Sequence, residues 1–555
     1  MKKSTKTYIA TFCILSIPML TGCSNSDKLS KLHIQKTPSS VELLNTIESK
    51  DFNRYSNSVV DFNLGKVTVG EGNELVDIEL KGTIGVPKGV TNAPIIFIFS
   101  GNNNSSTNEE TKEVDSYQGL NYLVDSLSKY GFLAISINTD IVLDDEKRGL
   151  IVEDKILSLA FEKHLEYLSK AISGRANNYP ISLYKKGDVE NIGLIGQSNT
   201  GRTIYNVASQ QVSKGSSSIK GLLSIAPSSG ISVSSYPDIP TSILSTEHSI
   251  DTNIAFDMYS DIEKSQNRQS IAHLTYLIGG VADKFNDLVK EEDLINNSAS
   301  RLTRTPIVMN DDTITDSEKH EEFLSSYSID FFDFIFNNRL EDSIYSVSNP
   351  TARKLYQKDV LSKLYTKNKS IIFDSTLIET ATFNSIKSKQ VIESSIPSID
   401  STPNFNEPAT NIELNLTQLD WKSVDSSMNI NINSSNKDFS EYSSLSIEWA
   451  LNQTNELNIN DIDKVSVSLI DSNGNKSEAV LLDELSLNKL SVEPNLSTYN
   501  GDNSTTWSRF TPIAETRIPL SLFKDINTKD IKSVSINFKD NNSGSILLKE
   551  ISLKK

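Results

Sequence analysis

Residues 191–202 carry the sequence NIGLIGQSNTGR, and the expected fold of this 555-residue chain is built outward from it. The apolar run at 192–195 predicts a strand buried on both faces, and a helical pattern follows Ser198. Gly196 and Gly201 flank the serine and leave room for a sharp strand-to-helix turn. Such a turn raises a serine hydroxyl above the sheet, where it can act as a nucleophile.

Buried strands and helices alternate on both sides of this turn. The predicted strands are 94–99, 132–137, 219–225, 241–246 and 274–278, and the predicted helices are 117–130, 157–172 and 323–336. Residues 59–86 predict an antiparallel hairpin at the sheet edge. This alternation favours a mainly parallel α/β sheet that is flanked by helices and linked by right-handed crossovers.

The hydropathy pattern changes towards the C-terminus. Three prolines among Ser, Asn and Asp at 394–410 predict a linker. Beyond it, strict alternation at 445–449, 465–469 and 534–538 predicts strands with one buried face, and Asn473-Gly474 predicts a tight hairpin turn. We therefore expect an antiparallel, jelly-roll-like β-sandwich at the C-terminal end.

The N-terminus has the pattern of an export signal. Three lysines precede an apolar stretch at 7–20, which is shorter than the roughly 20 residues that cross a bilayer core. The run Leu20-Thr21-Gly22-Cys23 follows, and it resembles a bacterial lipoprotein signal, in which the cysteine sulfur receives a lipid. The resemblance implies a protein anchored through Cys23 to the outer face of the bacterial cell membrane. The other cysteine, Cys13, lies in the segment expected to be removed, so no disulfide is expected.

Charge excludes one class of partner. The chain has 54 Lys and Arg against 71 Asp and Glu, a net charge of −17. A surface this acidic repels phosphate backbones, so nucleic acid is not expected to bind.

The strand, turn and helix around Ser198 resemble the α/β-hydrolase family, in particular exported serine esterases and lipases related to platelet-activating-factor acetylhydrolases and chlorophyllases. The resemblance covers about 86–338. It implies that Ser198 forms an acyl-enzyme with an ester or related acyl substrate, without a cofactor. It also implies an oxyanion hole made by the backbone N–H groups of Asn199 and of Gly101 or Asn102.

The acid and the base of a catalytic triad are less clear. The family places the acid after the strand at 241–246, where Asp251 is the first candidate and Glu247 the second. It places the histidine after the strand at 274–278, but residues 279–286 contain none. His320 preserves the family order of nucleophile, acid and base, and it precedes the last predicted helix. His320 also continues the inner apolar stripe of that helix, so a packing role is the alternative.

Two other histidines remain possible bases, and one rival function remains open. His248 lies beside the acid loop and His273 begins a strand. A serine needs a proton acceptor to become a nucleophile. Without one, the alternative is a catalytically degenerate scaffold that acts as a surface lipoprotein and binds carbohydrate or protein.

Other sites are weakly indicated. No HExxH, CxxC or paired-histidine spacing occurs, so no metal site is expected. The segment 471–475 favours a hairpin turn over a calcium loop. The C-terminal region resembles sandwiches appended to secreted hydrolases, which implies a carbohydrate partner. Trp507 is the candidate stacking residue, whereas Trp449 alternates with apolar residues and is expected in the core.

The predicted organisation has five segments. They are a signal peptide at 1–22, a lipid-anchored flexible tether at 23–40, an α/β-hydrolase domain at 41–349, a helical and Pro-Ser linker at 350–410 and the β-sandwich at 411–555.

Overall fold

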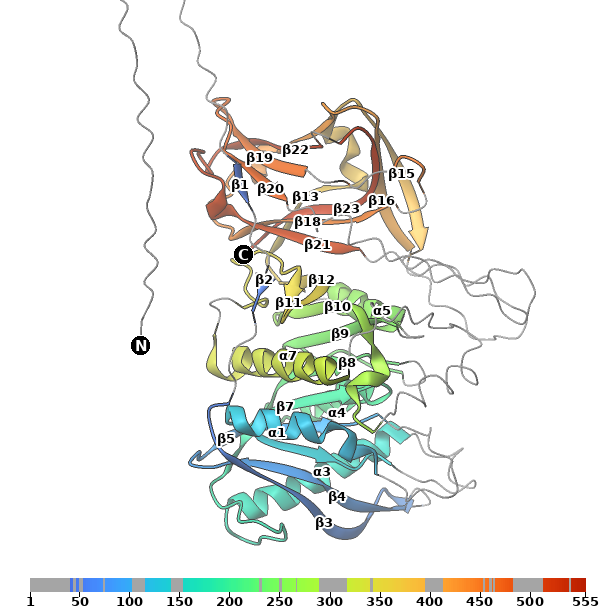
Figure 1. Ribbon diagram of the computed structural model, residues 1–555, viewed down its shortest axis with the longest axis vertical. Helices are drawn as coiled ribbons and strands as arrows, with labels where there is room; N and C mark the ends of the chain where they lie inside the picture. The colour runs from blue at the N-terminus through green and yellow to red at the C-terminus, as the bar shows by residue number, and fades with distance from the viewer. Residues whose placement is uncertain are drawn as a thin grey trace, which may run out of the picture. The chain divides into compact units, whose positions relative to one another are not determined.

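A computed structural model gives the fold of this chain (Figure 1). The structure describes residues 40–42, 46–48, 53–72, 75–101, 115–140, 153–228, 232–248, 252–265, 267–288, 317–339, 343–394, 413–452, 455–458, 462, 465–482, 513–538 and 541–555. The predicted signal and residues 23–39 of the predicted tether, with Cys23, lie outside these residues. No helix in the described part of the chain is both long and apolar enough to cross a lipid bilayer.

An 11-stranded sheet organises the first half of the chain. Its strand order is β2-β11-β12-β10-β9-β8-β7-β5-β6-β4-β3. The strands are β2 (Thr46–Ile47), β3 (Asn57–Val69), β4 (Val76–Pro87), β5 (Ala93–Phe99), β6 (Leu133–Ile137), β7 (Gly187–Gln197), β8 (Ile219–Ile225), β9 (Thr241–His248), β10 (Ala272–Val281), β11 (Lys354–Leu355) and β12 (Lys358–Tyr365). Pairing is parallel from β6 to β10, and antiparallel where β3, β4 and β12 extend the sheet.

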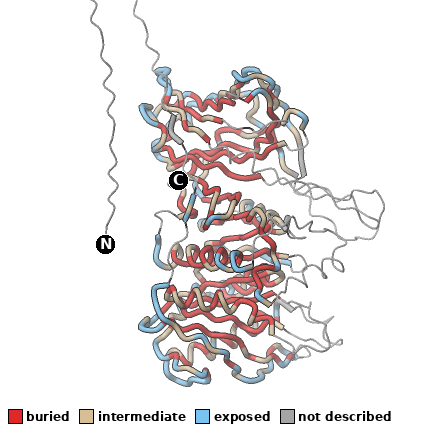
Figure 2. The backbone as a smooth tube through the Cα atoms, in the orientation of Figure 1, coloured by how far each residue is buried: buried red, intermediate tan, exposed pale blue. Residues whose placement is uncertain are grey.

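Helices pack on both faces of this sheet. Residues of α1 (Asn121–Tyr130) and α7 (Ser317–Asn337) share an apolar core with one face, and residues of α3 (Glu153–Ile172), α4 (Thr200–Ser213) and α5 (Thr252–Lys264) share a core with the other. Figure 2 shows buried backbone concentrated along the central strands. The central strands consist almost wholly of buried apolar residues, because they are covered on both faces.

Two further sheets form what we call the C-terminal sheet pair. One has the order β1-β20-β19-β22-β17-β14, and the other has β15-β16-β23-β18-β21, with β13 paired to β23. Their strands are β1 (Ser40–Glu42), β13 (Lys369–Asp374), β14 (Ala381–Asn384), β15 (Ile386–Ser394), β16 (Glu413–Trp421), β17 (Ser427–Asn431), β18 (Ser444–Leu451), β19 (Val465–Asp471), β20 (Ala479–Leu482), β21 (Ala514–Pro519), β22 (Ile531–Asn537) and β23 (Gly544–Lys554). Both sheets contribute to one apolar core.

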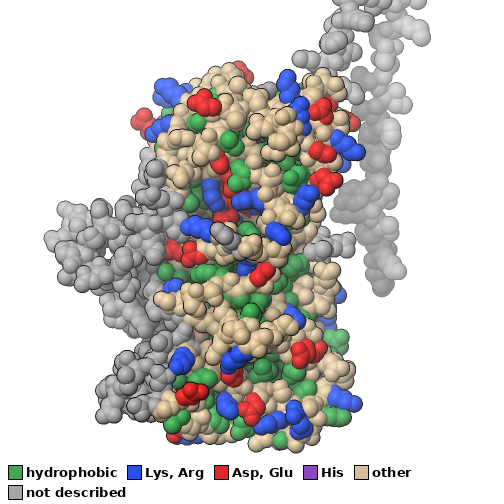
Figure 3. All heavy atoms as spheres, turned by 180° about the vertical axis from the view of Figure 1, so that it is seen from behind, with side chains coloured by type: hydrophobic (Ala, Val, Ile, Leu, Met, Phe, Trp, Pro, Cys, Tyr) green, Lys and Arg blue, Asp and Glu red, His purple; other side chains and the backbone are tan. Residues whose placement is uncertain are grey.

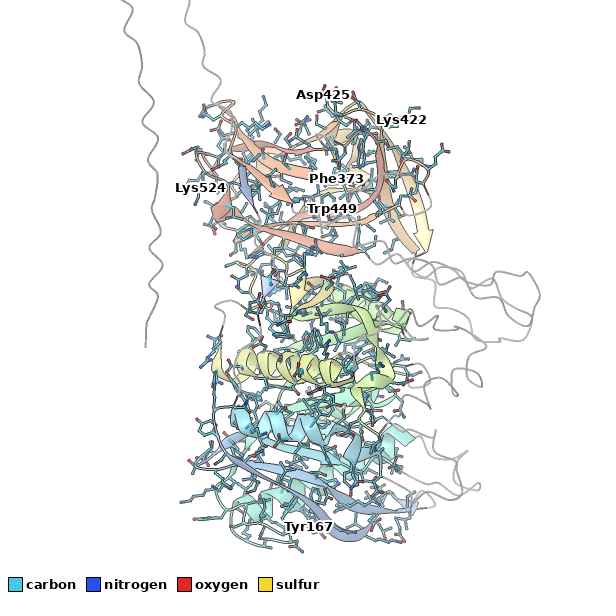
Figure 4. All side chains as sticks on the ribbon, viewed as in Figure 1. Tyr167, Phe373, Lys422, Asp425, Trp449 and Lys524 are labelled. Carbon is cyan, nitrogen blue, oxygen red and sulfur yellow. The ribbon has the colours of Figure 1, made fainter. Side chains whose placement is uncertain are left out.

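The C-terminal sheet pair has tryptophan inside and charged side chains at its rim. Trp449 and Phe373 are buried between the strands, whereas Lys422 and Asp425 are exposed (Figure 4). The Trp449 indole donates to Thr516 Oγ1 at 3.0 Å, so its predicted core position is confirmed. The Asn473-Gly474 turn is also confirmed, since Gly474 has φ 82° and its N–H donates to the Asp471 carbonyl.

The predicted fold class, a mainly parallel α/β-hydrolase sheet flanked by helices and followed by a jelly-roll-like sandwich, is wrong. Strands make up 42% of the structure and helices 25%, the large sheet is mixed, and helices are few. The central strands and the hairpin of β3 and β4 were predicted, but the extension by β11 and β12 was not. Fully buried strands dominate the hydropathy pattern, whereas edge strands carry polar residues and give a weaker signal.

The predicted boundaries differ from the observed strands at two places. The segment 350–410 was expected to be a linker, but its described part forms strands from β11 to β15. Residue 40 was expected to end a tether, yet β1 pairs with β20 in the C-terminal sheet pair and β2 then pairs with β11 in the large sheet. The N-terminal strands therefore join both parts of the fold.

Candidate functional site

Ser198 lies at the carboxyl edge of the large sheet, between β7 and α4. Its φ is 56°, in the left-handed region that L-residues other than Asn and Asp seldom adopt. Its N–H donates to the Ile225 carbonyl at 2.9 Å, and its own carbonyl accepts from the N–H groups of Gly201 and Ser228. The predicted strand-to-helix turn is thus confirmed, and its unusual backbone is held by hydrogen bonds on both sides.

Three glycines make this turn possible by letting neighbouring segments approach it closely. A Cβ atom on Gly101 would lie 2.8 Å from the Ser198 Cβ, and one on Gly196 would lie 2.3 Å from the Thr200 carbonyl oxygen. A Cβ on Gly201 would lie 2.9 Å from the Ser224 hydroxyl. The backbone of Gly101, at the end of β5, is therefore packed directly against the candidate nucleophile.

Thr200, two places after Ser198, links the turn to the neighbouring strand ends. Its Oγ1 donates to the Phe99 carbonyl at 2.6 Å and contacts the Gln197 carbonyl at 2.8 Å, and it accepts from the Gln197 N–H at 3.0 Å. The buried hydroxyl ties the ends of β5 and β7 to the start of α4. The next residue, Gly201, lets the start of α4 pack closely against Ser224 of β8.

The Ser198 hydroxyl has a serine as its partner. Its Oγ donates to the Ser228 Oγ at 3.4 Å, a long contact. Ser228 follows β8, next to Ala226, whose φ is 41°. Sequence reasoning missed Ser228, although parallel neighbours end at the same edge of a sheet, so the residue after β8 could have been placed beside the residue after β7.

His320, the first candidate for the base, is buried beside the end of β10. It lies in the first turn of α7, is 1% exposed, and its Nε2 accepts from the Val281 N–H at 3.1 Å at the end of β10. The edge of its ring contacts Phe285 at a centroid distance of 5.5 Å. The lone pair that could take a proton from serine is therefore bonded to a backbone N–H. Between residues whose side chains are described, no histidine is hydrogen-bonded to the Ser198 hydroxyl.

The other histidines fall into two groups. His248 pairs through its backbone with Val281, so it lies at the same edge as His320; its side chain is outside the described residues. His273 lies at the opposite end of β10, where burial lowers its pKa to about 3. His164 is buried on α3, where burial again lowers the pKa to about 3. The structure therefore places His248 and His320 near the carboxyl edge, and His273 away from it.

The remaining predicted residues are only partly described. Glu247 is the next-to-last residue of β9, before His248, and its Oε2 accepts from the Gly279 N–H at 2.6 Å. Asn199 caps α4, and its side chain accepts from the Thr200 N–H at 3.0 Å. Asp251, Asn102 and Trp507 lie outside the described residues.

No metal centre competes with this site in the described part of the chain. No group of three His, Cys, Asp or Glu side chains there is arranged to hold a metal ion. A small cavity of about 10 Å³ is lined by residues that include Phe256, Tyr276, Leu361 and Ala514, and no candidate site residue lines it. Positive and negative side chains are interspersed on the face shown in Figure 3.

Neither a family model nor a curated protein matches the chain.

Proposed function

We propose that this chain is a serine hydrolase that cleaves ester or related acyl bonds through an acyl-enzyme on Ser198. The observation that carries the proposal is the backbone of Ser198, whose φ of 56° at the end of a parallel strand is held by hydrogen bonds. A strained conformation costs roughly 1–3 kcal/mol and is concentrated at functional sites. The adjacent helix start is also suited to stabilise negative charge.

The proposed reaction has two steps. The Ser198 Oγ attacks the acyl carbon and loses its proton to a base, and the alcohol then leaves with a proton. Water hydrolyses the acyl-enzyme and restores the serine. In this proposal the N–H groups of Asn199 and of Gly101 or Asn102 stabilise the oxyanion, and no cofactor is used.

The proposed base is one of the two histidines at Val281. For His320 to act, its Nε2 must exchange the Val281 N–H for the Ser198 hydroxyl when substrate binds. Catalytic hydrogen bonds often tighten only in the substrate complex. His248 is the alternative, and Glu247 or Asp251 is the acid that orients the base.

Hydrolysis of a short-chain p-nitrophenyl ester by the purified protein tests the proposal. We expect Ser198→Ala to abolish turnover, and Ser213→Ala, on the last turn of the same helix, to leave it unchanged. His320→Gln and His248→Gln identify the base, because only the true base should reproduce the loss. Equal turnover by wild type and Ser198→Ala would refute the proposal.

A second function is favoured by the contacts of Ser198 and His320. Each is hydrogen-bonded to another partner, which is also what a scaffold without chemistry would show. In this case the chain is a surface lipoprotein that binds carbohydrate or protein. An inactive wild type that retains binding to isolated cell-wall polysaccharide would favour this function.

We also propose that the protein is exported and anchored to the outer face of the bacterial membrane by a lipid on Cys23. The supporting pattern is the short apolar stretch followed by Leu20-Thr21-Gly22-Cys23. Cys23→Ser should move the protein from the membrane fraction to the soluble fraction after cell lysis. Retention of the variant in the membrane fraction would contradict the proposed anchor.

A further inference from the structure

Buried and partly buried charged side chains lie where the large sheet meets the C-terminal sheet pair. We call them the charged interface, and they are Glu263 on α5, Lys363 on β12, Lys369 on β13, Glu448 on β18, Glu515 on β21, and Lys549, Glu550 and Lys554 on β23. Ion pairs that lose contact with water are costly unless each charge finds partners. Apolar packing alone does not explain why these charges lie at the interface.

Glu448 is at the centre of the charged interface and is 1% exposed. Its Oε2 lies 2.8 Å from the Lys363 Nζ of the large sheet and 2.9 Å from the Lys549 Nζ of its own sheet. Glu263 approaches the same two lysines at 3.6 and 3.3 Å. Each lysine is thus shared by one carboxylate from each part of the fold.

A second ion pair caps the edge of β12. Glu515 Oε2 accepts from the Leu364 N–H at 2.8 Å, and Lys554 Nζ donates to the Leu364 carbonyl. Glu515 and Lys554 are themselves 2.9 Å apart. In the described part of the fold, β11 pairs only with Lys358 and Asp359, so the rest of β12 has one side without a strand. Its buried backbone groups need partners, and at Leu364 the C-terminal sheet pair supplies them through charged side chains.

We propose that the charged interface is an acid-sensitive latch, which fixes the C-terminal sheet pair to β12 and α5 while its carboxylates are ionised and releases it when Glu448 is protonated. Apolar contacts cross the same boundary, because Tyr276 and Leu361 of the large sheet belong to the core of the C-terminal pair. The charged interface therefore makes the docking of the C-terminal sheet pair depend on pH, whereas the apolar contacts stabilise the docked state at every pH.

The sign of the pH dependence follows from the groups that face Glu448. Burial alone would raise its pKa, but Lys363, Lys549, Lys369 and Lys554 hold it well below the usual value. Glu263 is the carboxylate that shares the first three of these lysines, and burial and the charge of Glu448 both oppose the lowering of the pKa of Glu263. Burial also opposes ionisation of Glu515, yet Lys554 and Arg517 lower its pKa to about 2. Both values lie below those of the unfolded chain. The stabilisation is complete above about pH 4.5, decreases progressively as the pH falls below that value, and is fully lost only below the folded pKa values.

The unfolding of the large sheet and that of the C-terminal sheet pair can be followed separately by spectroscopy. All three tryptophans, Trp421, Trp449 and Trp507, lie in the C-terminal part of the sequence, and the α-helices of the described structure lie at 121–337. Tryptophan fluorescence therefore follows the C-terminal sheet pair, and helical circular dichroism follows the large sheet. Coincident transitions indicate coupled unfolding, and separate ones indicate release.

The test is urea unfolding of the full chain, followed by both probes from pH 7.5 down to pH 3. We expect one common midpoint at pH 7.5, and a separation of more than roughly 0.5 M urea that appears below about pH 4.5. Glu448→Gln should show this separation already at pH 7.5. Separate midpoints for wild type at pH 7.5, or one midpoint at every pH down to 3, would overturn the proposal.

Two further variants keep the test decisive. Lys369→Gln, at a position that is 22% exposed, should fold even if Glu448→Gln does not, and should give a smaller separation at pH 7.5. Glu166→Gln breaks an exposed pair with Lys163 and Lys170 on α3 and should change neither midpoint. Separation in Glu166→Gln, or its absence in Lys369→Gln, would count against the latch. Ester hydrolysis plays no part in these readouts, so they are independent of the proposed function.

Discussion

Thr200 shows how one side chain can hold the geometry of the candidate nucleophile. Its hydroxyl bonds to three backbone groups of Phe99 and Gln197, all of them buried. We expect Thr200→Val to lower the free energy of unfolding by about 2 kcal/mol, because those groups lose a partner. Thr200→Ser keeps the hydroxyl and should cost about 1 kcal/mol. Urea denaturation measures both, and a valine variant as stable as the serine variant would contradict this role.

Single residues of the site were predictable to different degrees. The turn at Ser198 follows from its flanking glycines, because only glycine allows the close approaches seen at Gly196 and Gly201. The position of His320 does not follow from local sequence. The packing of α7 brings His320 to Val281. Such a tertiary contact cannot be predicted from the sequence of residues 279–286, where the histidine was expected.

The close approach of β7 and α4 is a property of two elements and can be tested as such. Gly196→Ala would place a Cβ 2.3 Å from the Thr200 carbonyl oxygen, which is backbone and cannot yield. We expect a loss of roughly 3 kcal/mol in the free energy of unfolding. Gly221→Ala on neighbouring β8 is the matched control, since its Cβ would meet only side chains at 3.2 Å or more. Equal stability losses for the two variants would contradict the close approach.

Whole elements were predicted best where they are buried on both faces. β5, β6, β8 and β9 all match apolar runs in the sequence. The short strands β2 and β11, and the mixed pattern of β12, were missed because strands that are short or of mixed polarity carry little periodic signal. These strands pair with segments that are distant in the sequence, and the strand propensity of the residues themselves does not predict such pairing.

Two buried histidines make the stability of the whole molecule depend on pH. Burial lowers the pKa of His164 and His273 to about 3, whereas the unfolded chain binds these protons near pH 6.5. Stability should therefore fall as the pH drops below 6.5, by about 1.4 kcal/mol per pH unit for each histidine. The free energy of unfolding measured at pH 8, 6 and 5 checks this slope.

His164→Leu isolates one of these contributions. No atom in the described structure is hydrogen-bonded to the His164 ring nitrogens, and the edge of the ring contacts Phe62 at a centroid distance of 5.9 Å. We expect leucine to stabilise the protein by about 1 kcal/mol at pH 8, and by roughly 2 kcal/mol more at pH 5. A gain that is the same at both pH values would show that His164 is not held neutral.

The central claim, that Ser198 is an activated nucleophile, is tested most directly by covalent labelling. The protein is incubated with a fluorophosphonate and its intact mass is compared with that of Ser198→Ala and Ser213→Ala. We expect a single adduct on wild type and on Ser213→Ala, and none on Ser198→Ala. A folded wild type without an adduct, or equal labelling of Ser198→Ala, would contradict it.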